Sequence, residues 1–95
     1  MMEVYKRKGE MTLALMPECA INDVESDADK LRSKINDVEL ITVKSDQVTE
    51  MDTAYFQLIL SLMSTADEAG IQFSMPQMSD TVRDMFELFG LSIGD

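Results

Sequence analysis

The strongest constraint on the fold is the apolar stretch from residue 53 to residue 69, which predicts a buried helix. Its apolar residues recur at steps of four, three and four, so they share one helix face. These residues are Tyr55, Ile59, Leu62 and Ala66. Asp52 is a favourable N-cap just before the stretch, and Gly70 suits the left-handed residue that ends a helix.

Further apolar residues widen this face so far that most of the helix must be buried. They are Phe56, Leu58, Leu60 and Met63. The residues expected in the core are Leu58, Ile59, Leu62, Val43 and Phe86. A polar loop precedes the helix, so Asp52 and Thr53 are expected at its exposed amino end, and any function of the chain is expected near that end.

The remaining chain predicts a mixture of strands and helices. Alternating or β-rich runs predict strands at residues 2–6, 11–16, 38–43 and 71–75, and the strand at 38–43 is expected to be covered on both faces. Helices are expected from residue 22 to 35, and from an N-cap at Ser79 to Gly90. Strand–helix–strand order favours parallel pairing. We therefore predict an α/β fold in which about three helices pack on a small mixed sheet of four to five strands, as one domain over residues 1–95.

The first helix combines a narrow apolar stripe with many charges. Asn22 and Glu25 have the spacing of a capping box. The stripe is Val24, Ala28, Leu31 and Ile35, and the early acidic residues are Asp23, Glu25, Asp27 and Asp29. These acids are interpreted as a solvated helix face, with a partner-binding surface as the alternative.

Charge and composition argue against several classes of partner. The formal net charge is −10, which repels phosphate backbones and anionic membrane surfaces. No apolar run approaches the roughly 20 residues that a membrane-spanning helix needs, so direct membrane insertion is not expected. Cys19 is the only cysteine, which excludes an intrachain disulfide and is consistent with a cytoplasmic protein.

The sequence lacks the residues of the common catalytic and metal sites. It contains no histidine, and a single cysteine without histidine builds neither a thiol protease dyad nor a usual zinc site. No glycine-rich phosphate loop with a lysine occurs. We therefore expect no enzyme activity, no metal and no cofactor.

Two motifs together resemble a known family. The first is Asp52-Thr53-Ala54, followed by Gln57 to Leu62, Ala66 and Gly70; the second runs from Met78 to Leu91 and ends in Phe-Gly-Leu. Their order and spacing resemble the STAS domain, the fold of sulfate transporters and anti-sigma factor antagonists, in its stand-alone bacterial form. The resemblance covers about residues 11 to 93 and implies a regulatory protein–protein interaction module.

The resemblance also implies where a partner would bind. In anti-sigma factor antagonists, a partner kinase phosphorylates a serine or threonine in this loop, and its state decides partner binding. Here Ala54 occupies the usual acceptor position, Thr53 precedes it, and Tyr55 stands where the family often has glycine. The residues expected to form the partner face and phospho-switch are Asp52, Thr53, Asn22, Asp23 and Ser26.

Several partners remain open at this stage. Similar domains with Asp-Thr-Ala at this point occur beside chemotaxis proteins and in a phospholipid-transport ABC complex. The partner is thus an anti-sigma kinase-like protein, a chemotaxis component or a transporter ATPase. A nucleotide-binding module is a further alternative, against which the scarcity of basic residues near 45–65 argues. A homodimer is also left open.

Overall fold

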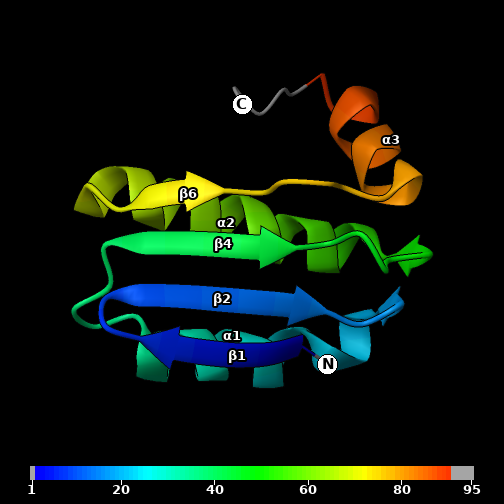
Figure 1. Ribbon diagram of the computed structural model, residues 1–95. Helices are drawn as coiled ribbons and strands as arrows, with labels where there is room; N and C mark the ends of the chain where they lie inside the picture. The colour runs from blue at the N-terminus through cyan, green and yellow to red at the C-terminus, as the bar shows by residue number, and fades with distance from the viewer. Residues whose placement is uncertain (1, 91–95) are drawn as a thin grey trace.

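The computed structural model describes residues 2–90 and contains a four-stranded mixed sheet with helices against one face (Figure 1). The strands of this sheet are β1 (Met2–Arg7), β2 (Glu10–Leu15), β4 (Leu40–Lys44) and β6 (Gln72–Ser74), in the spatial order β1-β2-β4-β6. A small second sheet pairs β3 (Glu18–Cys19) with β5 (Glu50–Met51). The helical elements are the 3-10 turn η1 (Ile21–Asp23), α1 (Val24–Lys34), α2 (Thr53–Ala69) and α3 (Asp80–Leu88). This architecture confirms the predicted fold class.

Pairing within the large sheet follows the expected directions. β1 and β2 form an antiparallel pair, joined at a turn where Gly9 adopts the positive φ of 84° that glycine tolerates. The Gly9 carbonyl accepts hydrogen bonds from the amides of Glu39 and Leu40, which ties this turn to the start of β4. β2 with β4 and β4 with β6 are parallel, as the strand–helix–strand order predicts.

Within residues 2–90 the sheet is covered on one face only, so the prediction that the strand at 38–43 is covered on both faces is wrong. Ile41 and Val43 of β4 are buried, whereas Leu40 and Thr42, which alternate with them, are partly exposed. Figure 1 shows α1 and α2 on the same side of the sheet, with α3 beyond one end of β6. Two successive crossovers of the same hand that advance in one direction across a sheet place their helices on the same face.

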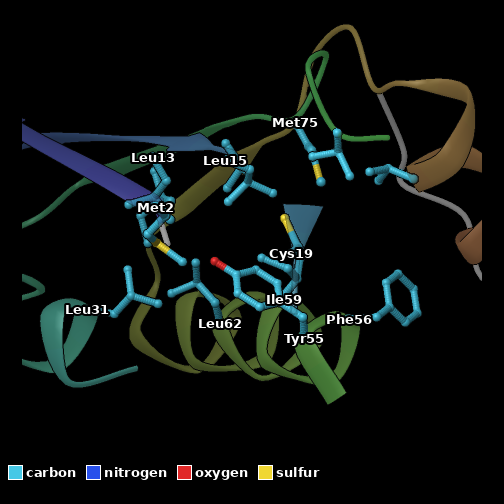
Figure 2. Close-up of a cluster of buried hydrophobic side chains, with 14 of the residues drawn as sticks. Met2, Leu13, Leu15, Cys19, Leu31, Tyr55, Phe56, Ile59, Leu62 and Met75 are labelled. Carbon is cyan, nitrogen blue, oxygen red and sulfur yellow. The ribbon is translucent and has the colours of Figure 1, made fainter. Parts of the chain in front are cut away.

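The helix α2 supplies the centre of the core. Figure 2 shows Leu13 and Leu15 of β2 opposite Tyr55, Ile59 and Leu62 of α2. The predicted stripe Tyr55, Ile59, Leu62 and Ala66 is buried, as is Phe56, whereas Leu58, Leu60 and Met63 are partly exposed, so less of the helix is buried than the sequence predicts. The helix starts after Asp52, whose extended backbone is that of an N-cap, and it ends at Gly70, which has the left-handed φ of 73°. The predicted start, buried stripe and end of this helix are confirmed.

Leu58 is the one residue of the predicted core that is not buried. Val43, Ile59, Leu62 and Phe86 are buried, but Leu58 is partly exposed. It lines a groove of about 310 Å³ between α1 and α2, together with Ala28 and Ile35. Because the Ala28 side chain is short, α1 does not cover Leu58 from its side of the groove.

Aromatic contacts attach α3 to α2. The ring of Phe56 meets the ring of Phe86 edge to face, with centroids 4.9 Å apart, and stacks on Phe89 at 5.2 Å. The Ser79 hydroxyl accepts a hydrogen bond from the Val82 amide at 3.2 Å, which confirms Ser79 as the N-cap of α3. Leu91, the last residue of the motif noted in the sequence, lies outside the described residues.

Replacing Leu62 tests the packing of α2. Leu62→Ala removes buried methyl groups and leaves a cavity, so the free energy of unfolding in urea should fall by about 2–5 kcal/mol. The exposed neighbour Ser61 provides the control, because Ser61→Ala should change this free energy by less than about 0.5 kcal/mol. A similarly small effect at Leu62 would mean that this face of α2 does not form the core.

Candidate functional site

Asp52 joins the start of α2 to the start of the first helical segment. Its Oδ2 accepts a hydrogen bond from the backbone amide of Ile21 at 2.8 Å, and its own amide donates to the Cys19 carbonyl at 2.9 Å. Its carbonyl accepts from the Phe56 amide at 3.0 Å, the first backbone bond of α2. The Asp52 carboxylate thus satisfies a free amide of η1 rather than one of its own helix.

The small sheet β3–β5 brings these two segments together. The Pro17 carbonyl accepts hydrogen bonds from the amides of Thr49 at 2.8 Å and Glu50 at 3.0 Å, and the Thr49 hydroxyl lies 3.2 Å from the same oxygen. These bonds hold the loop before α2 against the segment before η1. The sequence did not predict this sheet, because two-residue strands are too short to show an alternating pattern.

Five residues were predicted from the sequence to form a partner face, and the structure places them around the starts of η1, α1 and α2. Asn22, Ser26, Asp52 and Thr53 are exposed, and Asp23 is partly exposed. The capping box predicted between Asn22 and Glu25 is wrong, because Asn22 lies within η1 and α1 starts only at Val24. The Ser26 hydroxyl instead bonds to the Asp23 carbonyl at 3.2 Å. We call Ile21 and these five predicted residues the acidic corner.

The segments that form the acidic corner carry acidic but no basic side chains, and the acidic corner has one exposed apolar side chain. Residues 16–26 and 45–55 contain no lysine or arginine, and Glu18 lies directly opposite Glu50 in the β3–β5 register. Ile21 is 61% exposed although it is apolar. Sequence reasoning missed Ile21, because the predicted helix begins one residue later, at residue 22.

Behind the acidic corner, Asp27 of α1 is completely buried, so its interpretation as part of a solvated face is wrong. The Tyr55 hydroxyl of α2 donates to Asp27 Oδ2 at 2.7 Å, and the Met2 amide of β1 lies 3.3 Å from Oδ1. Lys30 Nζ lies 3.9 Å from Oδ1 and donates to the Met2 carbonyl at 3.2 Å. A buried carboxyl group needs such partners, because without them its desolvation is costly.

The environment of Tyr55 also affects its pKa. Burial raises the pKa of the Tyr55 hydroxyl above its usual value, and the hydrogen bond to Asp27 raises it further. The hydroxyl, which is protonated at neutral pH even with its usual pKa, is the donor in this bond. Tyr55, which stands where the resembling family often has glycine, links α2 to α1 through this bond.

The acidic corner offers no set of metal ligands. No group of three or more histidine, cysteine, aspartate or glutamate side chains among residues 2–90 could hold a metal ion. Cys19, next to the acidic corner, is 2% exposed, and burial raises the pKa of its thiol to about 11. No helix within residues 2–90 is long and apolar enough to cross a membrane.

The fold matches solved structures. The anti-sigma factor antagonist SpoIIAA in its unphosphorylated form matches with a TM-score of 0.84 and 21% identity, over 96% of this chain and 82% of that chain. The phosphorylated form of SpoIIAA, described as a Bacillus cell fate determinant, matches with a TM-score of 0.81 and 20% identity, over 96% and 85%. The chain has the STAS fold. Neither a family model nor a curated protein matches its sequence.

Replacing Tyr55 tests the link between the two helices of this STAS fold. Tyr55→Phe keeps the ring but removes a donor from the buried Asp27 carboxyl group, so the free energy of unfolding should fall by about 1–3 kcal/mol. Tyr5→Phe is the matched control, since the Tyr5 hydroxyl bonds to Glu3 at the surface and its loss should cost less than about 0.5 kcal/mol. If both variants lose the same free energy of unfolding in urea, the hydrogen bond from Tyr55 to Asp27 adds nothing to stability.

The thiol of Cys19 should be unreactive in the folded protein. With its pKa raised to about 11 by burial, Cys19 is almost fully protonated at pH 8, and the thiolate is the reactive form. Reaction with an aromatic disulfide reagent should be at least about 100-fold slower than in urea-unfolded protein, as the ratio of thiolate fractions alone requires. Equal rates in the two states would contradict the burial of Cys19.

Proposed function

We propose that this protein is a regulatory interaction module of the anti-anti-sigma type, which binds a protein partner through the acidic corner. The observation that carries the proposal is the match to SpoIIAA over 96% of the chain, together with Asp52 and Thr53 exposed at the start of α2. The module acts by binding rather than by catalysis. It works in the cytoplasm of a bacterium, where such signalling partners reside.

The chemistry of the acidic corner specifies the kind of partner. Its acidic side chains favour a basic protein surface, because complementary charges speed association and exclude wrong partners. Ile21 supplies an apolar side chain that can fill a pocket on the partner, with the surrounding polar residues as a rim. We therefore assign the partner as an anti-sigma kinase-like protein whose contact surface combines arginine or lysine with an apolar pocket. The lack of basic residues in the acidic corner disfavours a nucleotide as its ligand.

Thr53 is the residue through which such binding could be regulated. It is exposed as the first residue of α2, whereas Ala54 has no hydroxyl group. A phosphate at Thr53 would add nearly two negative charges, which a helix amino end tolerates. In an interface these charges would have to be desolvated, so phosphorylation would release the partner. SpoIIAA occurs in phosphorylated and unphosphorylated forms, which supports regulation of this kind.

A charge added at Thr53 should weaken partner binding without unfolding the protein. Thr53→Glu places a carboxylate at the start of α2, so the free energy of unfolding should change by less than about 1 kcal/mol. The partner is first captured with tagged wild-type protein from the native cells, identified and purified. Calorimetric titration should then give a dissociation constant at least about tenfold higher for the variant.

The matched control adds the same charge elsewhere on the same helix. Ser64 is exposed in the second half of α2, away from the acidic corner, and Ser64→Glu should leave the dissociation constant within about twofold. Unchanged binding by Thr53→Glu at unchanged stability would remove the acidic corner from the interface. Asp52 and Thr53 would then be only the residues that start α2.

A further inference from the structure

The face of the large sheet opposite α1 and α2 is uncovered by any helix or loop of residues 2–90 (Figure 1). Side chains of a strand alternate between faces, and the buried residues of each strand identify the inner face. The outer face, which we call the open face, carries Glu3, Tyr5, Arg7, Glu10, Thr12, Ala14, Leu40, Thr42, Lys44, Gln72 and Ser74. Each of these is partly or fully exposed.

The strand register arranges the open face in three rows that run across the strands. The middle row is uncharged and consists of Tyr5, Thr12, Thr42 and Ser74. One outer row contains Glu3, Ala14 and Lys44, and the other contains Arg7, Glu10, Leu40 and Gln72. A hydrogen bond of 3.0 Å from the Tyr5 hydroxyl to Glu3 Oε1 links the middle row to one outer row.

The formal charges of the open face cancel, although the whole chain carries −10. Glu3 and Glu10 are balanced by Arg7 and Lys44 on the same face. Two copies of so acidic a chain repel each other through most of their surfaces. The open face, whose charges balance, is therefore free of the net repulsion that the chain as a whole carries.

We propose that two copies of the chain pack open face against open face, about a two-fold axis that runs along the middle row. This rotation lays each middle row over the same row of the second copy and exchanges the outer rows, so the interface is isologous. Glu3 then faces Arg7 of the second copy, because both lie on β1 at equal distances from the middle row. Lys44 of β4 comes to lie diagonally opposite Glu10 of the second copy, because Glu10 is on the neighbouring strand β2.

The size of the open face predicts a weak dimer. Each partner of a standard interface contributes about 20–30 residues, whereas the open face consists of the eleven strand residues named above. We therefore expect the association to be weak and reversible. Because α2 and η1 start in the helix layer on the other side, the acidic corner stays free in this dimer (Figure 1).

Charge reversal on β1 tests the proposed dimer directly. At physiological salt, sedimentation of the wild-type protein between about 10 μM and 1 mM should show a reversible monomer–dimer equilibrium. Glu3→Arg places two arginines opposite each other, and Arg7→Glu does the same with two glutamates. Each variant alone should raise the dissociation constant at least about tenfold, because it replaces two attractive contacts by two repulsive ones.

Two combinations separate this pairing from damage to the fold. An equimolar mixture of the Glu3→Arg and Arg7→Glu variants should dimerise again, because every contact then joins an arginine to a glutamate. The double variant should also recover wild-type association. Glu68→Arg on the exposed side of α2 makes the same change in net charge as Glu3→Arg and should not weaken association. A wild-type protein that stays monomeric, single variants that dimerise normally, or a mixture that fails to dimerise would each overturn the proposal.

Discussion

The arrangement of α1 and α2 depends on the contacts of the buried Asp27 carboxyl group. It belongs to α1, accepts a hydrogen bond from Tyr55 of α2, and lies within hydrogen-bond distance of the Met2 amide of β1. Burying a polar group costs free energy because the group loses its hydrogen bonds to water, and its partners in the protein offset that cost. A buried group that loses a partner therefore destabilises the fold. The elements that supply these partners are therefore held in one relative position, which nonspecific apolar packing alone would define less sharply.

The position of α1 and α2 in turn determines the acidic corner. Tyr55 lies in the first turn of α2, so its bond to Asp27 fixes the amino end of that helix from inside. The Asp52 carboxylate makes the matching connection at the surface, to the amide of Ile21. The pairing of β3 with β5 adds a third connection, between the segments that precede η1 and α2. A site built in this way presents Thr53 on a rigid helix end rather than on a loose loop.

The sequence predicted most of the fold, because the strongest elements are specified locally. The face of α2, its N-cap Asp52 and its stop at Gly70 all follow from spacing and residue type. Asp27 was misinterpreted because a charge on an otherwise polar helix normally faces water. Its spacing to Val24 and Leu31 places it on the apolar stripe, but the partners that make its burial tolerable, among them Tyr55 and the Met2 amide, come from distant parts of the chain. The short strands that assemble the acidic corner have no local signature at all.

The acidic corner and the open face differ in how their charges are distributed. The acidic corner gathers negative side chains where two helices start, so its electrostatic potential attracts a basic surface and repels a second acidic chain. The open face balances its charges row by row and so lacks this bias. If both proposals hold, a single acidic domain keeps its proposed partner site free of its own copies, because repulsion at the acidic corner disfavours self-association there and leaves it to the open face.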